Sequence, residues 1–229
     1  LSARTFSKAI AYADEADSTL EFNAPEVLRR NRARTTYDRT HNLQSAFVAE
    51  LPFGHGKRWA QQGWARRLLG GWQLNGIFSS YSGTPFSVTA SGTSLNAPNN
   101  TQTADQIKPV VKILGGAGPG QSFFDPLAFR AVTGVRFGNS GLNILRGPGV
   151  VNLDLGLFRE FGVRERVKIQ FRAEAFNATN TPHFNNPGTN VSNLQLRPDG
   201  LVAQLRGFSE ITGAQNDERQ FRFGLRVSF

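Results

Sequence analysis

The chain has 229 residues, a formal net charge of +9 and no cysteine, which excludes a disulfide framework, a thiolate metal site and a cysteine nucleophile. The basic residues are dispersed along the chain rather than gathered in one run, so the sequence predicts no nucleic-acid partner despite the positive charge. No stretch of about 18 apolar residues occurs, which excludes a transmembrane helix within this sequence but leaves shorter, alternating membrane strands possible.

The first residue is Leu1, the chain contains no methionine, and no basic-then-apolar signal segment opens it. We therefore expect either a processed product or a fragment of a longer protein.

Three strands are expected in the first half of the chain. Residues 41–53 and 72–89 each alternate apolar with polar side chains, as a one-sided strand requires. Residues 1–12 are expected to end a further strand, with an unclear register. The polar residues 13–40 predict a long loop, and we expect its arginine cluster, 29–34, to be a solvated face.

The connection between the second and third expected strands contains all three tryptophans of the chain, Trp59, Trp64 and Trp72. A short helix is expected there over residues 60–69. Tryptophan at a connection suits the belt of aromatic residues at a membrane–water interface, and a small hydrophobic cluster under a loop is the alternative.

A hairpin is the clearest feature of the second half. Residues 150–161 and 167–176 both alternate, and only a short turn separates them. Residues 90–149 lack periodicity and are rich in glycine, asparagine and proline, and residues 177–218 form another long polar stretch. Loops of this size are unusual in a compact soluble domain but are common outside large membrane barrels.

The last strand, residues 219–229, alternates without a break up to the terminal carboxylate. Phe221, Phe223, Leu225, Val227 and Phe229 share one side, and polar residues share the other. Two interpretations fit this stretch alone: a membrane strand with lipid on one face, or a half-buried edge strand of a soluble sandwich.

The lengths of the connections between the expected strands favour the membrane-barrel interpretation. Counted back from the C-terminus they are long, short, long, medium and long, as in an up-and-down barrel with long external loops and short periplasmic turns. The sequence therefore predicts an all-β fold: about six antiparallel strands of a larger transmembrane β-barrel. Six strands cannot close around a wide pore, so we expect an open curved sheet with both edges unpaired and large floppy lobes at one end.

A series of segments, taken together, resembles the C-terminal end of TonB-dependent outer-membrane receptors of the Oar-like kind. The segments are YDRTHNL (37–43), ELPFGHGKR (50–58), LLGGWQLNGIFSSYSGTPFSV (68–88), FDPLAF (124–129), RFGNSGLNILRGPG (136–149), FRAEAFNATNTPHFNNPG (171–188) and RFGLRVSF (222–229). The resemblance covers essentially the whole chain, in order.

The resemblance implies a barrel of about 22 strands, filled by an N-terminal plug, that imports a ligand with energy relayed from the inner membrane through TonB. Neither a plug nor an energy-coupling box occurs in this sequence, so we expect the chain alone to be unable to transport. The resemblance also implies that the terminal aromatic strand, with Phe229, Val227 and Leu225, is an assembly signal read by the barrel-assembly machinery.

Five charged residues of the last two strands are expected to face the barrel lumen: Lys168, Arg172, Glu174, Arg222 and Arg226. One hypothesis pairs them across the strands, with Glu174 opposite an arginine, and lets them contact the plug. Plain solvation in a wet lumen is the alternative.

No catalytic, cofactor or metal site is predicted. The glycine-rich run 114–122 lacks the Gly-Lys-Ser/Thr ending of a phosphate loop and is expected to be flexible. The histidines, His41, His55 and His183, lie in separate segments. The acidic group at 14–17 is expected to be a solvated turn rather than a cation site.

Three functions are therefore weighed. The first is the wall of a TonB-dependent transporter in the outer membrane, in contact with the bilayer and lipopolysaccharide. The second is a structural or adhesive outer-membrane barrel that imports nothing. The third is a soluble, basic, β-rich binding module.

Overall fold

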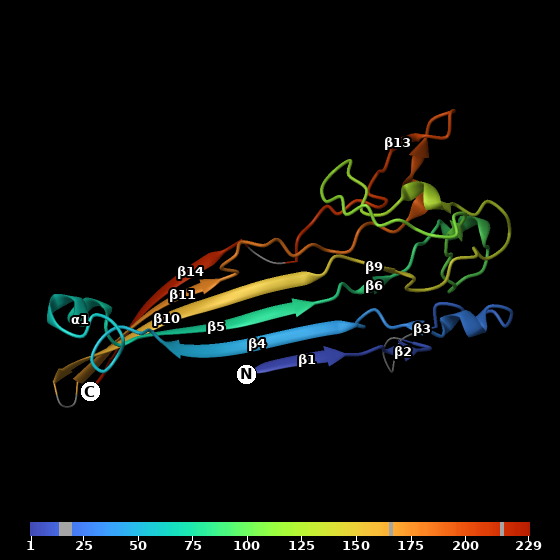
Figure 1. The fold of residues 1–229 in the computed structure, drawn as a ribbon. Helices are drawn as coiled ribbons and strands as arrows, with labels where there is room; N and C mark the ends of the chain where they lie inside the picture. Colours follow the sequence, from blue (N-terminus) through green and yellow to red (C-terminus); the bar gives the residue numbers. More distant parts are fainter. Residues whose placement is uncertain (14–19, 165–166, 216–217) are drawn as a thin grey trace.

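The structure is a computed structural model that describes residues 1–13, 20–164, 167–215 and 218–229. It contains one six-stranded antiparallel sheet with strand order β1-β4-β5-β10-β11-β14 (Figure 1). Each strand pairs with the next large strand along the chain, which is the up-and-down pattern. The strands are β1 (Ser2–Phe6), β4 (His41–Glu50), β5 (Trp72–Tyr81), β10 (Val150–Arg164), β11 (Val167–Phe176) and β14 (Gln220–Ser228). The sheet stays open, with β1 and β14 at its edges, and the predicted fold class is confirmed.

The register of the sheet places apolar residues of neighbouring strands opposite one another. Phe171 lies opposite Leu225, Ala173 opposite Phe223, and Leu155 lies between Ala175 and Gly76. Because side chains alternate between faces, these pairs make one mostly apolar face. We call this set the apolar face: Leu43, Phe47, Ala49, Trp72, Leu74, Phe78, Val151, Leu153, Leu155, Leu157, Phe161, Ile169, Phe171, Ala173, Ala175, Phe221, Phe223, Leu225 and Val227. Ser45, Ser80, Arg4 and Arg159 share this side with them.

No second layer covers the apolar face within the described residues. Phe223 is 70% exposed and Leu225 is 73% exposed, and Val150 is the only described hydrophobic residue of the six strands that is buried. A half-buried strand of a soluble sandwich would have these side chains packed beneath a second sheet. That alternative is wrong for β14.

Three expected strands end well before the predicted residue and one is longer. The second, predicted to reach residue 53, ends at Glu50. The first leaves the sheet after Phe6, and the third ends at Tyr81 instead of continuing to residue 89. Gly83 approaches the backbone of Gly147 so closely that a Cβ there would lie 1.9 Å from its carbonyl oxygen. Close packing of two loop segments thus replaces strand pairing. β10 continues to Arg164, three residues beyond the expected end.

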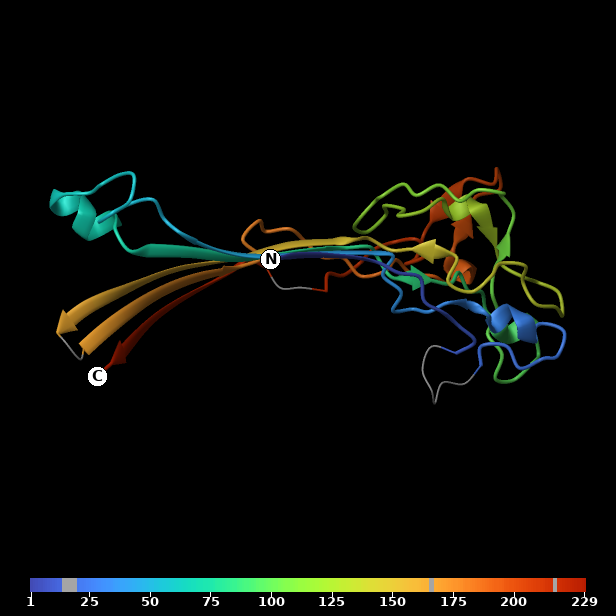
Figure 2. The same cartoon turned by 60° about the horizontal axis from the view of Figure 1, so that its bottom comes forward.

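The long joins meet at one end of the sheet in what we call the loop lobe, residues 82–149 and 177–215 (Figures 1 and 2). Short elements build it and the N-terminal loop beside it. They are β2 (Ile10–Ala11), β3 (Ala33–Arg34), β6 (Pro85–Phe86), β7 (Asp105–Gln106), β8 (Phe129–Arg130), β9 (Leu145–Arg146), β12 (Gln195–Leu196), β13 (Val202–Gln204) and the 3-10 helices η1 (Leu28–Asn31), η2 (Gly92–Ser94), η3 (Pro126–Ala128) and η4 (Val191–Asn193).

The loop lobe has its own hydrophobic core, so the expectation of floppy lobes is wrong. Phe124 is fully buried, and its ring lies 5.3 Å from Phe208, 5.8 Å from Phe129 and 5.9 Å from Phe86, measured between centroids. Ser209 ties the same core together, because its hydroxyl donates to the Phe124 carbonyl at 2.6 Å and accepts from the Phe124 N–H at 2.9 Å. Aromatic burial on this scale gives the loops a fixed shape.

The opposite end of the sheet has the connection between β4 and β5, with helix α1 (Gly63–Leu69) inside the range predicted. Figure 2 shows α1 to one side of the sheet, beyond the start of β5. We call this the turn end. Among the described residues, no helix combines the length and apolar character that a membrane crossing requires.

Candidate functional site

The second side of the sheet is the polar face, and it contains all five charges singled out from the sequence. Lys168, Arg172 and Glu174 alternate along β11, and Arg222 and Arg226 alternate along β14. Glu174 lies opposite Arg222, with 3.8 Å between its Oε2 and the guanidinium Nη1. The side chain of Arg222 is 71% exposed, so water screens this pair strongly.

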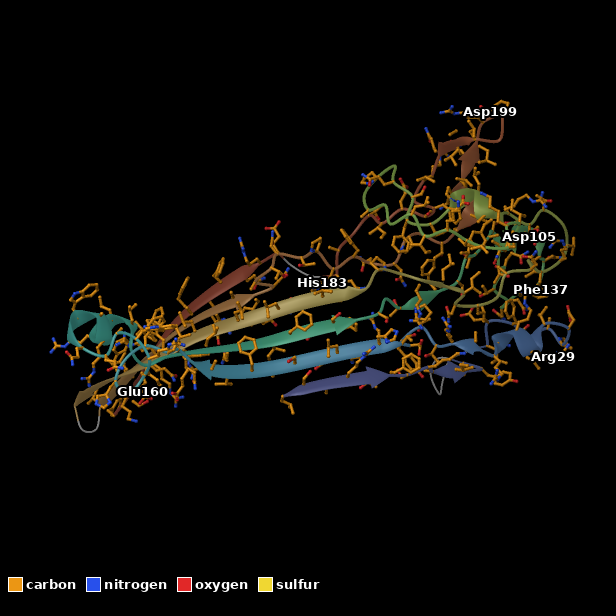
Figure 3. The ribbon with its side chains drawn as sticks, viewed as in Figure 1. Arg29, Asp105, Phe137, Glu160, His183 and Asp199 are labelled. Atoms are coloured by element: carbon orange, nitrogen blue, oxygen red, sulfur yellow. The ribbon has the colours of Figure 1, made fainter. Side chains whose placement is uncertain are left out.

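The other charges have different partners. Lys168 pairs with Glu160 of β10 at 2.9 Å, and Figure 3 places Glu160 at the turn end. Arg172 donates to the Gln170 side chain at 2.8 Å, and its guanidinium lies 5.4 Å from the centre of the Phe158 ring. The polar face therefore carries more positive than negative charge on β11 and β14.

An apolar patch interrupts the polar face, and the sequence analysis missed it. A shallow cavity of about 350 Å³ lies over β4, β5 and β10, where Val48 is 68% exposed and Ile77 is 53% exposed beside Phe158. The alternation of the sequence contained the signal, since Ala46, Val48 and Ile77 occupy positions of polar parity. The patch makes the polar face a mixed surface rather than a uniformly wet one.

The end of β14 is open to its surroundings. Phe229 is fully exposed and Val227 is 55% exposed. Leu225, the third residue of the expected assembly signal, lies on the same apolar face. Nothing in the described chain covers these three side chains.

Two of the three tryptophans are at least half exposed. Trp64 is 75% exposed and Trp59 is 50% exposed. Trp72 begins β5 on the apolar face and meets the Phe171 ring edge-on at 5.9 Å. The hydrophobic-cluster alternative is therefore wrong for Trp64, whereas the Trp59 ring lies 5.7 Å from the Phe53 ring in the same connection.

The N-terminal loop is anchored to the loop lobe by charged side chains, and its arginines are not all solvated as expected. Arg30 donates to the Thr103 hydroxyl at 3.1 Å and to the Ser140 carbonyl, and burial lowers its pKa. Arg146 pairs with the fully buried Asp38 and donates to the Gly83 carbonyl at 2.9 Å. These contacts join segments 63 to 110 residues apart in the sequence.

Two buried carboxylates of this end have lowered pKa values. The Arg136 guanidinium holds Asp105 by two hydrogen bonds, at 2.6 and 2.9 Å, and these lower the pKa of Asp105 against the opposing effect of burial. Burial by itself would raise the pKa of Asp38, but the Ala9 N–H and Arg146 outweigh it and hold that pKa below its ordinary value. Figure 3 shows Asp105 in the loop lobe, far from the turn end.

A cavity of about 510 Å³ lies between the N-terminal loop and the loop lobe. Its lining is rich in hydroxyl and amide groups, but these are largely bonded to one another. Thr84 donates to Asn186, and Asn143 bonds both Ser87 and the Arg34 carbonyl. Such mutual bonding stabilises the docking of the loops.

The remaining sequence motifs do not form a site. No group of three metal-ligating side chains occurs among the residues that the structure describes. His183 is buried, and its Nε2 lies 3.0 Å from the Val151 carbonyl, where the loop lobe meets the sheet (Figure 3). The run 114–122 is an ordered turn, because the Leu114 and Gly115 N–H groups donate to the Phe123 carbonyl. The acidic residues Asp14, Glu15 and Asp17 lie outside the described residues.

An open antiparallel sheet with one exposed apolar face and one mixed polar face, and with its long loops at one end, defines a segment of a membrane barrel. The family model described as "Outer membrane beta barrel domain" matches residues 1–222. The chain therefore belongs to this family and is localised to the outer membrane. A search of curated proteins and a search of solved structures found no match. The family assignment leaves the soluble binding module without support.

Proposed function

We propose that the chain forms the C-terminal part of the barrel wall, with its external loops, of a TonB-dependent transporter that imports a ligand. The open sheet supports the barrel-wall part of this proposal: β1 and β14 are edges of a six-stranded sheet. An unpaired backbone N–H or C=O costs several kcal/mol in hydrocarbon. Further strands must therefore pair with both edges, and the six strands alone form no transport pathway.

In this proposal the apolar face contacts lipid and the polar face lines the lumen. The loop lobe lies outside the cell, beside lipopolysaccharide, and the turn end lies in the periplasm, as in barrels with long external loops. Lys168, Arg172, Glu174, Arg222 and Arg226 then face the lumen and contact the plug. The patch at Val48, Ile77 and Phe158 gives this lumen wall a place for apolar as well as charged contacts.

The proposal also assigns partners. Phe229, Val227 and Leu225 present an exposed apolar chain end that the barrel-assembly machinery can recognise before insertion. The chain acts without a cofactor, without catalysis and without nucleic acid.

TonB dependence is the part to test. The natural full-length protein, in its own outer membrane, is treated with formaldehyde and isolated. We expect a cross-linked complex with TonB that disappears when TonB is deleted. An inserted protein that never cross-links to TonB would overturn the proposal.

A structural or adhesive barrel is the second candidate, and the packed core of the loop lobe favours it. A fixed external surface is what adhesion to another surface needs, whereas a mobile loop can close over a ligand. The same cross-linking experiment separates the two, because an adhesive barrel has no use for TonB.

A further inference from the structure

Helix α1 has an apolar stripe that is largely exposed. Trp64 is 75% exposed, Leu68 is 60% exposed and Leu69 is 45% exposed, and no residue of the helix is buried. At 3.6 residues per turn these three side chains lie on one side, and Arg66 and Arg67 lie on the other. A helix of seven residues is marginal alone in water, so it depends on a surface that covers the stripe.

The helix is fixed to the apolar side of the sheet, not to the polar side. Trp72, on the apolar face, donates from its indole N–H to the Leu68 carbonyl at 2.9 Å. Arg159 alternates on the same side of β10 and donates to the Arg67 and Leu68 carbonyls. Both contacts satisfy carbonyls at the C-terminal end of the helix, where cations are also favoured.

Basic residues occupy the other side of the helix and the segment before it. Arg58 lies 5.2 Å from the centre of the Trp59 ring, and Arg66 and Arg67 leave the helix on the side away from the stripe. A short helix with tryptophan and leucine on one side and arginine on the other matches a surface that is apolar below and anionic above. The boundary between acyl chains and phosphate groups is such a surface.

We propose that α1 is an interfacial anchor that lies on the phospholipid headgroup layer at the turn end, with Trp64, Leu68 and Leu69 in the acyl boundary and Arg58, Arg66 and Arg67 at lipid phosphates. We choose lipid as the partner of the stripe because Trp72 and Arg159 join the helix directly to the apolar face, which contacts lipid in the proposed function. The anchor fixes the depth of the β4–β5 end in the bilayer. This inference rests on the proposed function in one respect, that the sheet spans the membrane.

The test places a photoreactive benzophenone side chain in place of Trp64. The natural full-length protein is reconstituted in vesicles of phosphatidylethanolamine and phosphatidylglycerol that contain a radiolabelled phospholipid. Two matched versions carry the same group in place of Phe223 on the apolar face and in place of Arg222 on the polar face. After illumination, we expect lipid adducts at the first two positions at least tenfold above those at the third.

Each outcome decides something. Lipid adducts in place of Phe223 but not of Trp64 would overturn the anchor and leave the membrane-spanning sheet intact. No lipid adduct at either position would overturn both, and a protein adduct in place of Trp64 would show that another protein covers the stripe.

A second measurement tests the role of the arginines on the helix. Each arginine near an anionic surface strengthens binding by about fivefold. Arg66→Gln with Arg67→Gln should therefore lower the yield of lipid adducts in vesicles with phosphatidylglycerol and leave it unchanged in vesicles of phosphatidylcholine alone. If the double substitution changed the yield equally in both kinds of vesicle, the role of the anionic headgroup charge would be contradicted.

Discussion

The loop lobe and the sheet use the same kind of side chain in opposite ways. Phe124 and Phe208 in the loop lobe are fully buried, whereas Phe223 of β14 is 70% exposed. The loop lobe thus supplies its own apolar environment, as a soluble domain does. The sheet has an apolar face of similar chemistry and depends on the bilayer to cover it.

Because of this difference, the loop lobe and the sheet gain their stability from different surroundings. Burying a phenylalanine contributes about 1.5–3 kcal/mol whether protein or hydrocarbon covers it. The loop lobe gains this contribution when its own segments meet, and the sheet gains it only on insertion. Left in water, an apolar face of this extent is an aggregation site.

The largest effect is expected from the core of the loop lobe. Phe124→Ala removes the ring that contacts Phe86, Phe129 and Phe208, and should cost about 3–5 kcal/mol of lobe stability. Protease added outside intact cells should then cut within residues 82–149, while the sheet stays inserted. Val135→Ala is the control, since Val135 is 83% exposed and should give no new cleavage. Equal protection of both variants would contradict a packed lobe.

The next effect is expected on the apolar face. Leu225→Arg places a charge toward lipid and should cost about 2–4 kcal/mol in a bilayer. Gln44→Arg is the control, because Gln44 is exposed on the polar face of β4, opposite Ser79. Denaturant unfolding of the full-length protein in vesicles measures both free energies. A larger cost for Gln44→Arg would reverse the assignment of the faces.

Acid should loosen the loop lobe before it affects the sheet. The pKa values of Asp38 and Asp105 are lower in the folded chain than the ordinary carboxyl pKa of about 3.9. Each carboxylate therefore stabilises the folded chain fully at pH values above about 3.9, and this contribution is lost as the pH falls through the lower folded pKa. Protease resistance of the loop lobe should decline below about pH 4. Asp105→Asn should show a shallower decline, because one of the two carboxylates is gone. A pH profile unchanged by that substitution would contradict the role of Asp105.

The smallest effect is expected at the cross-strand pair of the polar face. Glu174→Gln removes an ion pair whose partner, Arg222, is mostly exposed, and should cost about 1 kcal/mol or less. The temperature at which the full barrel changes its mobility on a gel measures this loss of stability. A loss of stability as large as that for Leu225→Arg would contradict the view that Glu174 and Arg222 form a weak, solvent-screened ion pair.

Much of the sheet was predictable because period-two alternation over about ten residues fixes both the strand and its faces. The opposition of Glu174 and Arg222 follows from that register. The core around Phe124 was not predictable, since it gathers residues from Phe86 to Ile211 through strands of two or three residues that have no visible period. The contacts of Arg30 and Asp38 were hidden for the same reason, because their partners lie about 70 to 110 residues away.

The central claim is that one face of the sheet contacts lipid, and β14 tests it most directly. The 229 residues contain no cysteine, so single cysteines in place of Phe221, Arg222, Phe223, Gly224, Leu225 and Arg226 report without background from this part of the chain. In the inserted full-length protein, a charged, water-soluble maleimide should label the cysteines that replace Arg222, Gly224 and Arg226 and spare the three that replace apolar residues. Labelling without alternation, or with the opposite phase, would contradict the account.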